Sequence, residues 1–174
     1  MKATAILSVM LIASFCVTTG TLSAAQTTSA DQAIVTPSLA GTWSLIAADV
    51  LHPDGTRARD FGAAPDGLLM IDSQGRYTLQ IFKSERPRFA SGDKLTGTPD
   101  EYAAAVLGSS THFGTLSIDA AAGTLTFSIR KASFPNWEGD RQVRHYELKG
   151  DELSYRVTPR PNGDVPISVW KRVR

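Results

Sequence analysis

The clearest pattern in the sequence is a series of short runs in which hydrophobic and polar residues alternate. In one run, Leu125, Phe127 and Ile129 share a face, and the intervening residues are threonine and serine. A period of two is typical of a strand with one buried face. The runs predict strands at 41–50, 67–72, 76–82, 111–119, 124–130, 142–148, 152–157 and 165–173. We therefore expect an all-β fold, an eight-stranded up-and-down antiparallel barrel without open sheet edges.

A single helix interrupts this pattern between the third and fourth predicted strands. Thr98 is a capping hydroxyl, Pro99 stands at the first helical position and Glu101 follows three residues after the cap. These residues form a capping box, and Gly108 is a natural stop. The sequence predicts a short helix with a narrow apolar stripe that includes Tyr102.

The connections between the predicted strands differ in length in a regular way. The second, fourth and sixth are tight turns that contain glycine, whereas the first, third and fifth are long. Alternate connections of an up-and-down barrel lie at opposite ends, so the long loops should surround one end. An eight-stranded barrel is filled by side chains or holds one small ligand. We favour a ligand cavity with a mouth at the long-loop end over a solid core that the loops merely cap.

The start of the chain has the features of a secretory signal peptide. Lys2 precedes the apolar run AILSVMLIASFCV, and small residues end at Ala25. The apolar run is too short for a retained membrane anchor, and Phe15 before Cys16 does not fit a lipid-attachment site. We expect a signal peptide at 1–25, a flexible arm at 26–38 and the barrel domain at 39–174, with export to the periplasm or the medium.

Composition excludes several classes of function. Cleavage after Ala25 removes Cys16, so neither a disulfide nor a thiolate metal site is expected. It also leaves 17 basic and 17 acidic side chains, because the leader holds one base and no acid. This balance gives no basic face for nucleic acid. The three histidines lack metal-ligand spacing, so we expect no metal site. We also expect no cofactor and a monomer.

The first and last predicted strands carry a known signature. The first strand opens with GTW at 41–43, and the last ends with VWKR at 169–172. Together with GLLMIDSQGRYTLQIF, HFGTLSIDAAAGTLTFSI and FPNWEGDRQVRHYEL, they resemble the lipocalin-like domain family of bacterial and some fungal proteins. The resemblance implies a small barrel with a cavity, in which Trp43 plugs the closed end and Arg172 packs across it. It implies little about chemistry, since fold does not fix function.

The alternation also assigns inward and outward faces. His112 shares a face with the apolar residues of its strand and should point inward near the mouth, whereas His145 should point outward. Arg144 should point inward too, and a buried guanidinium needs a partner. A protein carboxylate such as Glu101 or Asp140 and a ligand carboxylate, phenolate or carbonyl are both open at this point.

Aromatic and basic residues of the loops complete the candidate site. The segment SFPNWEGD places Phe134 and Trp137 in a mouth loop, although they can also pack on the helix. Arg88 and Phe89 precede the helix, and His52 should be solvated in the first long loop. The candidate ligand-binding residues are Tyr77, Arg88, Phe89, Tyr102, His112, Phe134, Trp137, Arg144 and Tyr155.

Three functions fit these expectations. The first is an exported carrier of a small, mainly hydrophobic molecule that can bear an anionic or carbonyl group. The second is a cofactor-free isomerase or cyclase in the same cavity, with His112 or a tyrosine as acid and base. The third is a solid-cored domain that binds other proteins through its loops. No nucleophile motif such as G-x-S-x-G is present.

Overall fold

The structure is a computed structural model that describes residues 39–174. The predicted signal peptide at 1–25 and the predicted arm at 26–38 lie outside these residues. The expected barrel domain, 39–174, coincides with the described part of the chain.

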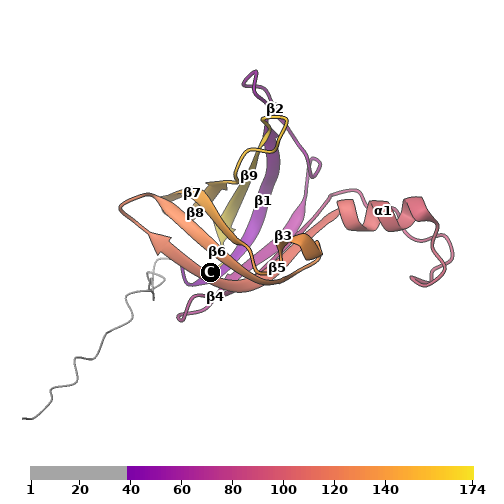
Figure 1. Ribbon diagram of the computed structural model, residues 1–174, viewed down its shortest axis with the longest axis horizontal. Helices are drawn as coiled ribbons and strands as arrows, with labels where there is room; N and C mark the ends of the chain where they lie inside the picture. Colours follow the sequence, from indigo (N-terminus) through magenta and orange to yellow (C-terminus); the bar gives the residue numbers. More distant parts are fainter. Residues whose placement is uncertain (1–38) are drawn as a thin grey trace, which may run out of the picture.

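In residues 39–174, nine antiparallel strands form a single sheet whose first and last long strands pair with each other. The strands are β1 (Gly41–Leu51), β2 (Arg57–Ala58), β3 (Asp66–Ile71), β4 (Arg76–Phe82), β5 (Ser109–Asp119), β6 (Thr124–Ala132), β7 (Arg141–Lys149), β8 (Glu152–Arg156) and β9 (Val165–Arg172). The eight long strands follow one another around a closed up-and-down barrel (Figure 1). The predicted all-β barrel fold is confirmed. The additional β2 pairs only with the end of β1, and a strand of two residues is too short to show alternation.

Inward side chains of the barrel follow the alternation of the sequence except at two irregularities. In β1, the register shifts between Leu45 and Ala47, which leaves Ile46 half exposed outside the core. Between β5 and β6 it shifts next to Gly114. A Cβ on Gly114 would lie 2.0 Å from the carbonyl oxygen of Ser128, so the close approach of the strands requires glycine there.

The helix α1 (Pro99–Leu107) lies between β4 and β5, the third and fourth long strands. Its capping box has the expected form, because Thr98 accepts from the backbone of Glu101 and the Glu101 carboxylate accepts from the backbone of Thr98. The helix has no buried residue, and it extends from the barrel as an arm together with the loop that precedes it (Figure 1). The apolar stripe therefore does not pack on the barrel: Tyr102 is 39% and Val106 54% exposed.

The closed end of the barrel is organised around Trp43, which is fully buried. Its indole nitrogen donates to the carbonyl oxygen of Leu39 at 3.0 Å. The guanidinium carbon of Arg172 lies 4.0 Å from the centre of the Trp43 ring, and its Nη1 donates to the carbonyl oxygen of Ala40 at 2.9 Å. One arginine thus covers the plugging ring and holds the chain that enters β1, in a contact that contributes roughly 0.5–2 kcal/mol.

We predict that Arg172→Met lowers the free energy of unfolding by about 1–3 kcal/mol, because it removes both the contact with the Trp43 ring and the bond to the Ala40 carbonyl. Urea unfolding followed by tryptophan fluorescence measures this change. Arg174→Met is the matched control. Both arginines pair with Asp151, but Arg174 is highly exposed. Equal effects of the two substitutions would show that the ring contact contributes nothing specific.

Candidate functional site: a cavity at the long-loop end

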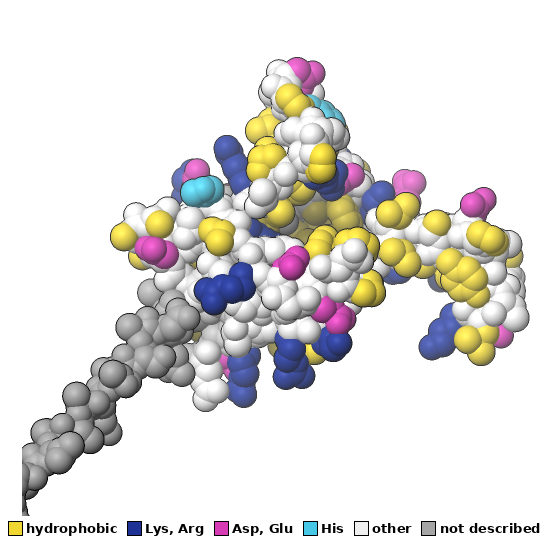
Figure 2. Space-filling view, in the orientation of Figure 1, with side chains coloured by type: hydrophobic (Ala, Val, Ile, Leu, Met, Phe, Trp, Pro, Cys, Tyr) yellow, Lys and Arg dark blue, Asp and Glu magenta, His cyan; other side chains and the backbone are white. Residues whose placement is uncertain are grey.

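A cavity of about 740 Å³ occupies the long-loop end of the barrel. Its wall comes from inward residues of β1, β4, β5, β7, β8 and β9, such as Ala48, Leu79 and Ser168. Val106 and Leu107, at the base of the α1 arm, lie at its rim. Figure 2 shows hydrophobic side chains in the hollow where the upper loops, the barrel and the arm meet. The barrel is therefore not filled by side chains at this end.

Three polar side chains form a buried chain of contacts between the core and the cavity. Tyr77 comes from β4, His112 from β5 and Arg144 from β7. The Tyr77 hydroxyl lies 2.7 Å from Nδ1 of His112, and Nη2 of Arg144 lies 3.4 Å from Nε2 of the same ring. His112 and Arg144 line the cavity, whereas Tyr77 lies behind them in the core.

The protonation state of this chain follows from its donors. Arg144 carries only N–H donors, so Nε2 of His112 accepts and Nδ1 carries the hydrogen that is donated to Tyr77. Burial, and then the nearby Arg144 charge, lower the pKa of His112 from 6.5 to about 3. Burial also raises the pKa of Tyr77 above its ordinary value. The imidazole and the phenol are therefore both neutral at physiological pH.

Arg144 is held by its neighbours without a carboxylate. Its guanidinium carbon lies 4.2 Å from the ring centre of Phe127 and 5.0 Å from that of Tyr155. Nη2 donates to the side-chain oxygen of Gln142 at 2.8 Å. No ion pair within residues 39–174 includes Arg144. The guanidinium is thus oriented by stacking and by one amide.

The two carboxylates considered as protein partners of Arg144 are engaged or placed elsewhere, so neither of them is its partner. Glu101 accepts from the backbone of Ala90 and of Thr98, and these hydrogen bonds lower its pKa. Asp140 is exposed in the loop before β7. The capping box already uses Glu101, which explains why it does not reach the barrel interior.

The segment SFPNWEGD forms one side of the cavity. A single 3-10 turn, η1 (Pro135–Trp137), follows Phe134, and both aromatic residues of the segment line the cavity. The Trp137 ring meets the Phe134 ring edge to face at 5.4 Å, and it meets the His112 ring in the same way at 6.1 Å. Trp137 packs against the core, while Phe134 is 45% exposed. The prolyl turn thus orients one ring inward and leaves the other at the rim.

Three residues expected at the mouth lie away from the cavity lining. Phe89 packs edge to face on Tyr102 at 5.4 Å, and both belong to the arm. The Tyr102 hydroxyl donates to the carbonyl oxygen of Lys94 and accepts from the backbone of Gly97, so it stabilises the loop of the arm. Arg88 is exposed on the same loop. Strand periodicity does not determine the direction in which a long loop extends. For this reason the sequence places these three residues at the mouth, whereas they lie on the arm.

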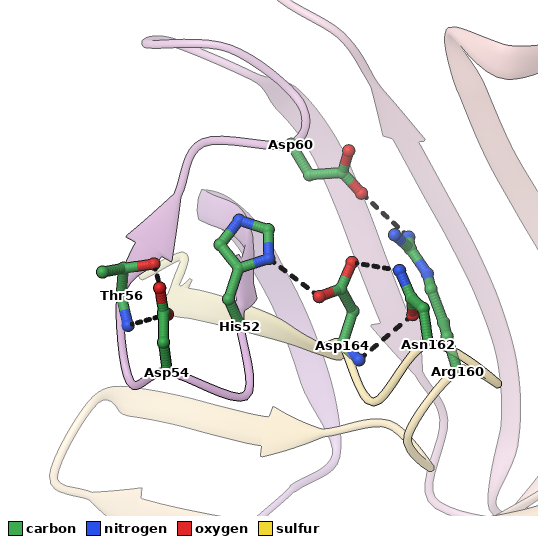
Figure 3. Close-up of polar contacts among 7 residues, drawn as sticks. All are labelled: His52, Asp54, Thr56, Asp60, Arg160, Asn162 and Asp164. Carbon is green, nitrogen blue, oxygen red and sulfur yellow. Dashed lines mark hydrogen bonds and ion pairs between the residues drawn. The ribbon is translucent and has the colours of Figure 1, made fainter.

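Two loops at the rim are joined by polar contacts between residues far apart in the sequence (Figure 3). Nδ1 of His52 lies 2.7 Å from Asp164, whose other oxygen accepts from Asn162 at 2.8 Å. Nη2 of Arg160 lies 2.8 Å from Asp60, and both of these side chains line the cavity. The loop after β1 is thereby tied to the loop before β9.

The contact with Asp164 corrects the expectation for His52, which is not simply solvated. Its side chain is 37% exposed, and its ring bonds to Asp164. The hydrogen bond from His52 first, and then that from Asn162, lower the pKa of Asp164. The Asp164 carboxylate is therefore ionised at neutral pH.

Sequence reasoning missed several residues of the site. Gln142 follows the same alternation as Arg144, so its inward position could have been read from the strand pattern. The alternation puts Phe127 on one face with Leu125 and Ile129, but its stacking on the guanidinium depends on the pairing of β6 with β7. The pair of Asp60 and Arg160 joins two loops without periodicity, and no sequence signal identifies it.

Two kinds of feature are absent from residues 39–174. No group of three or more histidine, aspartate, glutamate or cysteine residues is arranged to hold a metal ion there. No helix of this part is long and apolar enough to cross a membrane.

Comparison with known proteins gives a family match. The sequence model of the lipocalin-like domain matches residues 40–173, which covers almost all of the described chain. No curated protein and no solved structure matches the chain.

We predict that His112 makes the stability of the protein fall in acid. Because the folded pKa of about 3 lies below the ordinary 6.5, the unfolded chain binds the proton first as the pH falls. The contribution of neutral His112 to the free energy of unfolding is present above pH 6.5. About 2–3 kcal/mol of this contribution should be lost between pH 7 and 4.5. Urea unfolding of wild type and His112→Gln at both pH values measures the difference.

The control for this experiment is His145→Gln, which changes an exposed histidine of β7. Carboxylates titrate alike in all three proteins, so only the difference between variants is used. His112→Gln should be less stable at pH 7 but should show the smaller loss on acidification. An unchanged pH dependence in His112→Gln contradicts a buried neutral imidazole.

Proposed function

Since the chain belongs to the lipocalin-like domain family, we propose that its barrel holds one small, mainly hydrophobic molecule with a polar end directed at Arg144. The family barrel supports small-molecule binding as the general function. The finer statement, a carrier for a hydrophobic ligand, rests on the cavity of this chain. Fold alone would not justify it.

The cavity is the observation that carries the proposal. Its volume of about 740 Å³ falls within the range of roughly 300–1,000 Å³ that small-molecule sites occupy. Leu79, Ile81 and Trp137 supply apolar wall, and a few polar groups converge near Arg144. An apolar body with one polar end matches this distribution. A solid-cored domain that uses only its loops is less consistent with such a volume.

The isomerase or cyclase alternative has less support from the same geometry. His112 is the histidine that lines the cavity, and a pKa of about 3 makes it a weak base at neutral pH. Its ring nitrogens are turned to Tyr77 and Arg144. A general base is most effective when its pKa lies near the working pH. The arrangement is better suited to orienting Arg144 than to moving protons.

Export is a separate part of the proposal, supported by the leader sequence. If residues 1–25 act as a signal peptide, protein recovered from the periplasm or the medium begins at Gln26. Intact-mass spectrometry of that fraction gives the N-terminus directly. Recovery of the full chain from the cytoplasm alone would contradict export, and it would leave the cavity proposal standing.

We predict that the neutral fluorophore N-phenyl-1-naphthylamine binds one-to-one in the cavity, with enhanced fluorescence. Ala48 lines the cavity and pairs with Ser168, another small residue of the wall. Ala48→Phe should fill this space and weaken binding at least tenfold, since a ring displaces the volume that the probe needs. Fluorescence titration measures the dissociation constant.

The same substitution one residue earlier is the matched control. Ala47 precedes Ala48 in β1 and points to the other face of the sheet. Ala47→Phe should bind the probe as the wild type does. Absence of binding to the wild type, or equal loss in both variants, would count against a ligand site in the barrel. Circular dichroism establishes that each variant is folded.

A further inference from the structure

We propose that the polar end of the bound molecule is an anion, and that this protein takes an organic acid whose carboxylate is held by Arg144 and the hydroxyl of Tyr155. This inference rests on the proposed function and specifies its ligand. The recognising chemistry is one guanidinium and one phenol at the wall of an apolar cavity.

The first observation is a pair of buried donors without partners. Arg144 is 6% and Tyr155 1% exposed, and both line the cavity. Nε of Arg144 and the hydroxyl of Tyr155 are each buried without a hydrogen bond. Buried polar groups are normally satisfied, and each unsatisfied group carries a desolvation cost. A ligand acceptor that reaches both groups would remove that cost.

The two side chains are neighbours in the cavity wall. The guanidinium carbon of Arg144 lies 5.0 Å from the ring centre of Tyr155, and the ring belongs to the adjacent strand. Two oxygens of one carboxylate can accept from two separate donors at once. Binding would lose little side-chain entropy at Arg144, because Phe127 and Gln142 already hold the guanidinium in place.

The second observation is the charge of the cavity wall. Two acids line it, and each already has an arginine: Asp49 pairs with Arg57 at 2.7 Å, and Asp60 pairs with Arg160 at 2.8 Å. Arg144 has no such partner within residues 39–174.

A second lining cation adds to this imbalance. Lys83 also lines the cavity, and its ammonium lies 5.8 Å from the ring centre of Phe61; none of the ion pairs of the described chain includes it. The wall therefore presents two cations that no carboxylate balances. Arg144 is the buried cation, and Lys83, which is half-buried, lies nearer the solvent.

These charges favour an anion over a neutral carbonyl group. A lone buried charge is unfavourable, and a neutral acceptor would satisfy the hydrogen bond without balancing that charge. A carboxylate does both, with the planar match that guanidinium groups offer. His112 does not add a competing positive charge, because it is neutral beside Arg144.

Displacement of N-phenyl-1-naphthylamine by 2-naphthoate and by 2-naphthamide tests this inference. The two competitors have the same ring system and nearly the same size, and they differ in charge. We expect the acid to displace the probe at a concentration about 10- to 100-fold lower than the amide, the ratio that one charge-assisted hydrogen bond supplies. This comparison uses the wild-type chain and needs no variant.

Variants assign the preference to its residues. Arg144→Met should remove the preference for the acid while the probe still binds. Tyr155→Phe, which keeps the ring, should reduce it by a smaller factor. Arg130→Met is the matched control: Arg130 also stacks on an aromatic ring, that of Phe113 at 5.0 Å, but it is exposed on the outside of the barrel. It should leave the preference unchanged.

The outcomes separate the two proposals. If the probe does not bind to the wild type, the proposed function fails. If it binds but the amide competes as well as the acid, or the acid does not compete, the anion inference fails alone. Loss of the preference in Arg130→Met as well would assign it to overall charge and overturn the role of Arg144. If Arg144→Met does not fold, the anion inference is still tested by Tyr155→Phe and by the ratio of acid to amide competition in the wild type.

Discussion

The pairing of β1 with β9 is the contact on which the rest of the molecule depends. It extends from Trp43 opposite Arg172 to Leu51 opposite Val165, so it joins the plugged end to the mouth. Without it, the inward faces of the sheet would be one side of an open layer, and the cavity would have no enclosing wall. Closure also places the ends of two distant segments together, which is how a residue near the C-terminus covers the tryptophan at the start of β1.

Most of the barrel could be predicted from the sequence, because the period of two has a direct physical cause in strand geometry. The same period predicts the inward position of Arg144, which is buried. The α1 helix was predictable through its cap, since a capping box is a local arrangement. What could not be predicted depends on loops: the direction of the α1 arm, and the tie between Asp60 and Arg160 across 100 residues. Those features are set by tertiary contacts.

The two halves of the barrel interior differ in how they are packed. The half near Trp43 is filled by fully buried side chains such as Leu69, Leu125 and Leu153. The half near the mouth leaves space and keeps Arg144 with unsatisfied hydrogen-bonding capacity. Unsatisfied buried polar groups lower the free energy of unfolding. The packing of the filled half must offset this loss. Buried polar groups left unsatisfied in this way are expected where a site serves function at the expense of packing.

The two ends of the described chain both lie at the closed end of the barrel. Leu39 contacts Trp43 through its carbonyl oxygen, and Arg174 pairs with Asp151 in the turn between β7 and β8. A tether attached at either end therefore emerges on the side opposite the mouth. Protein immobilised on a sensor surface, or fused to a second domain, through these ends keeps the mouth turned to the solvent and open to solutes.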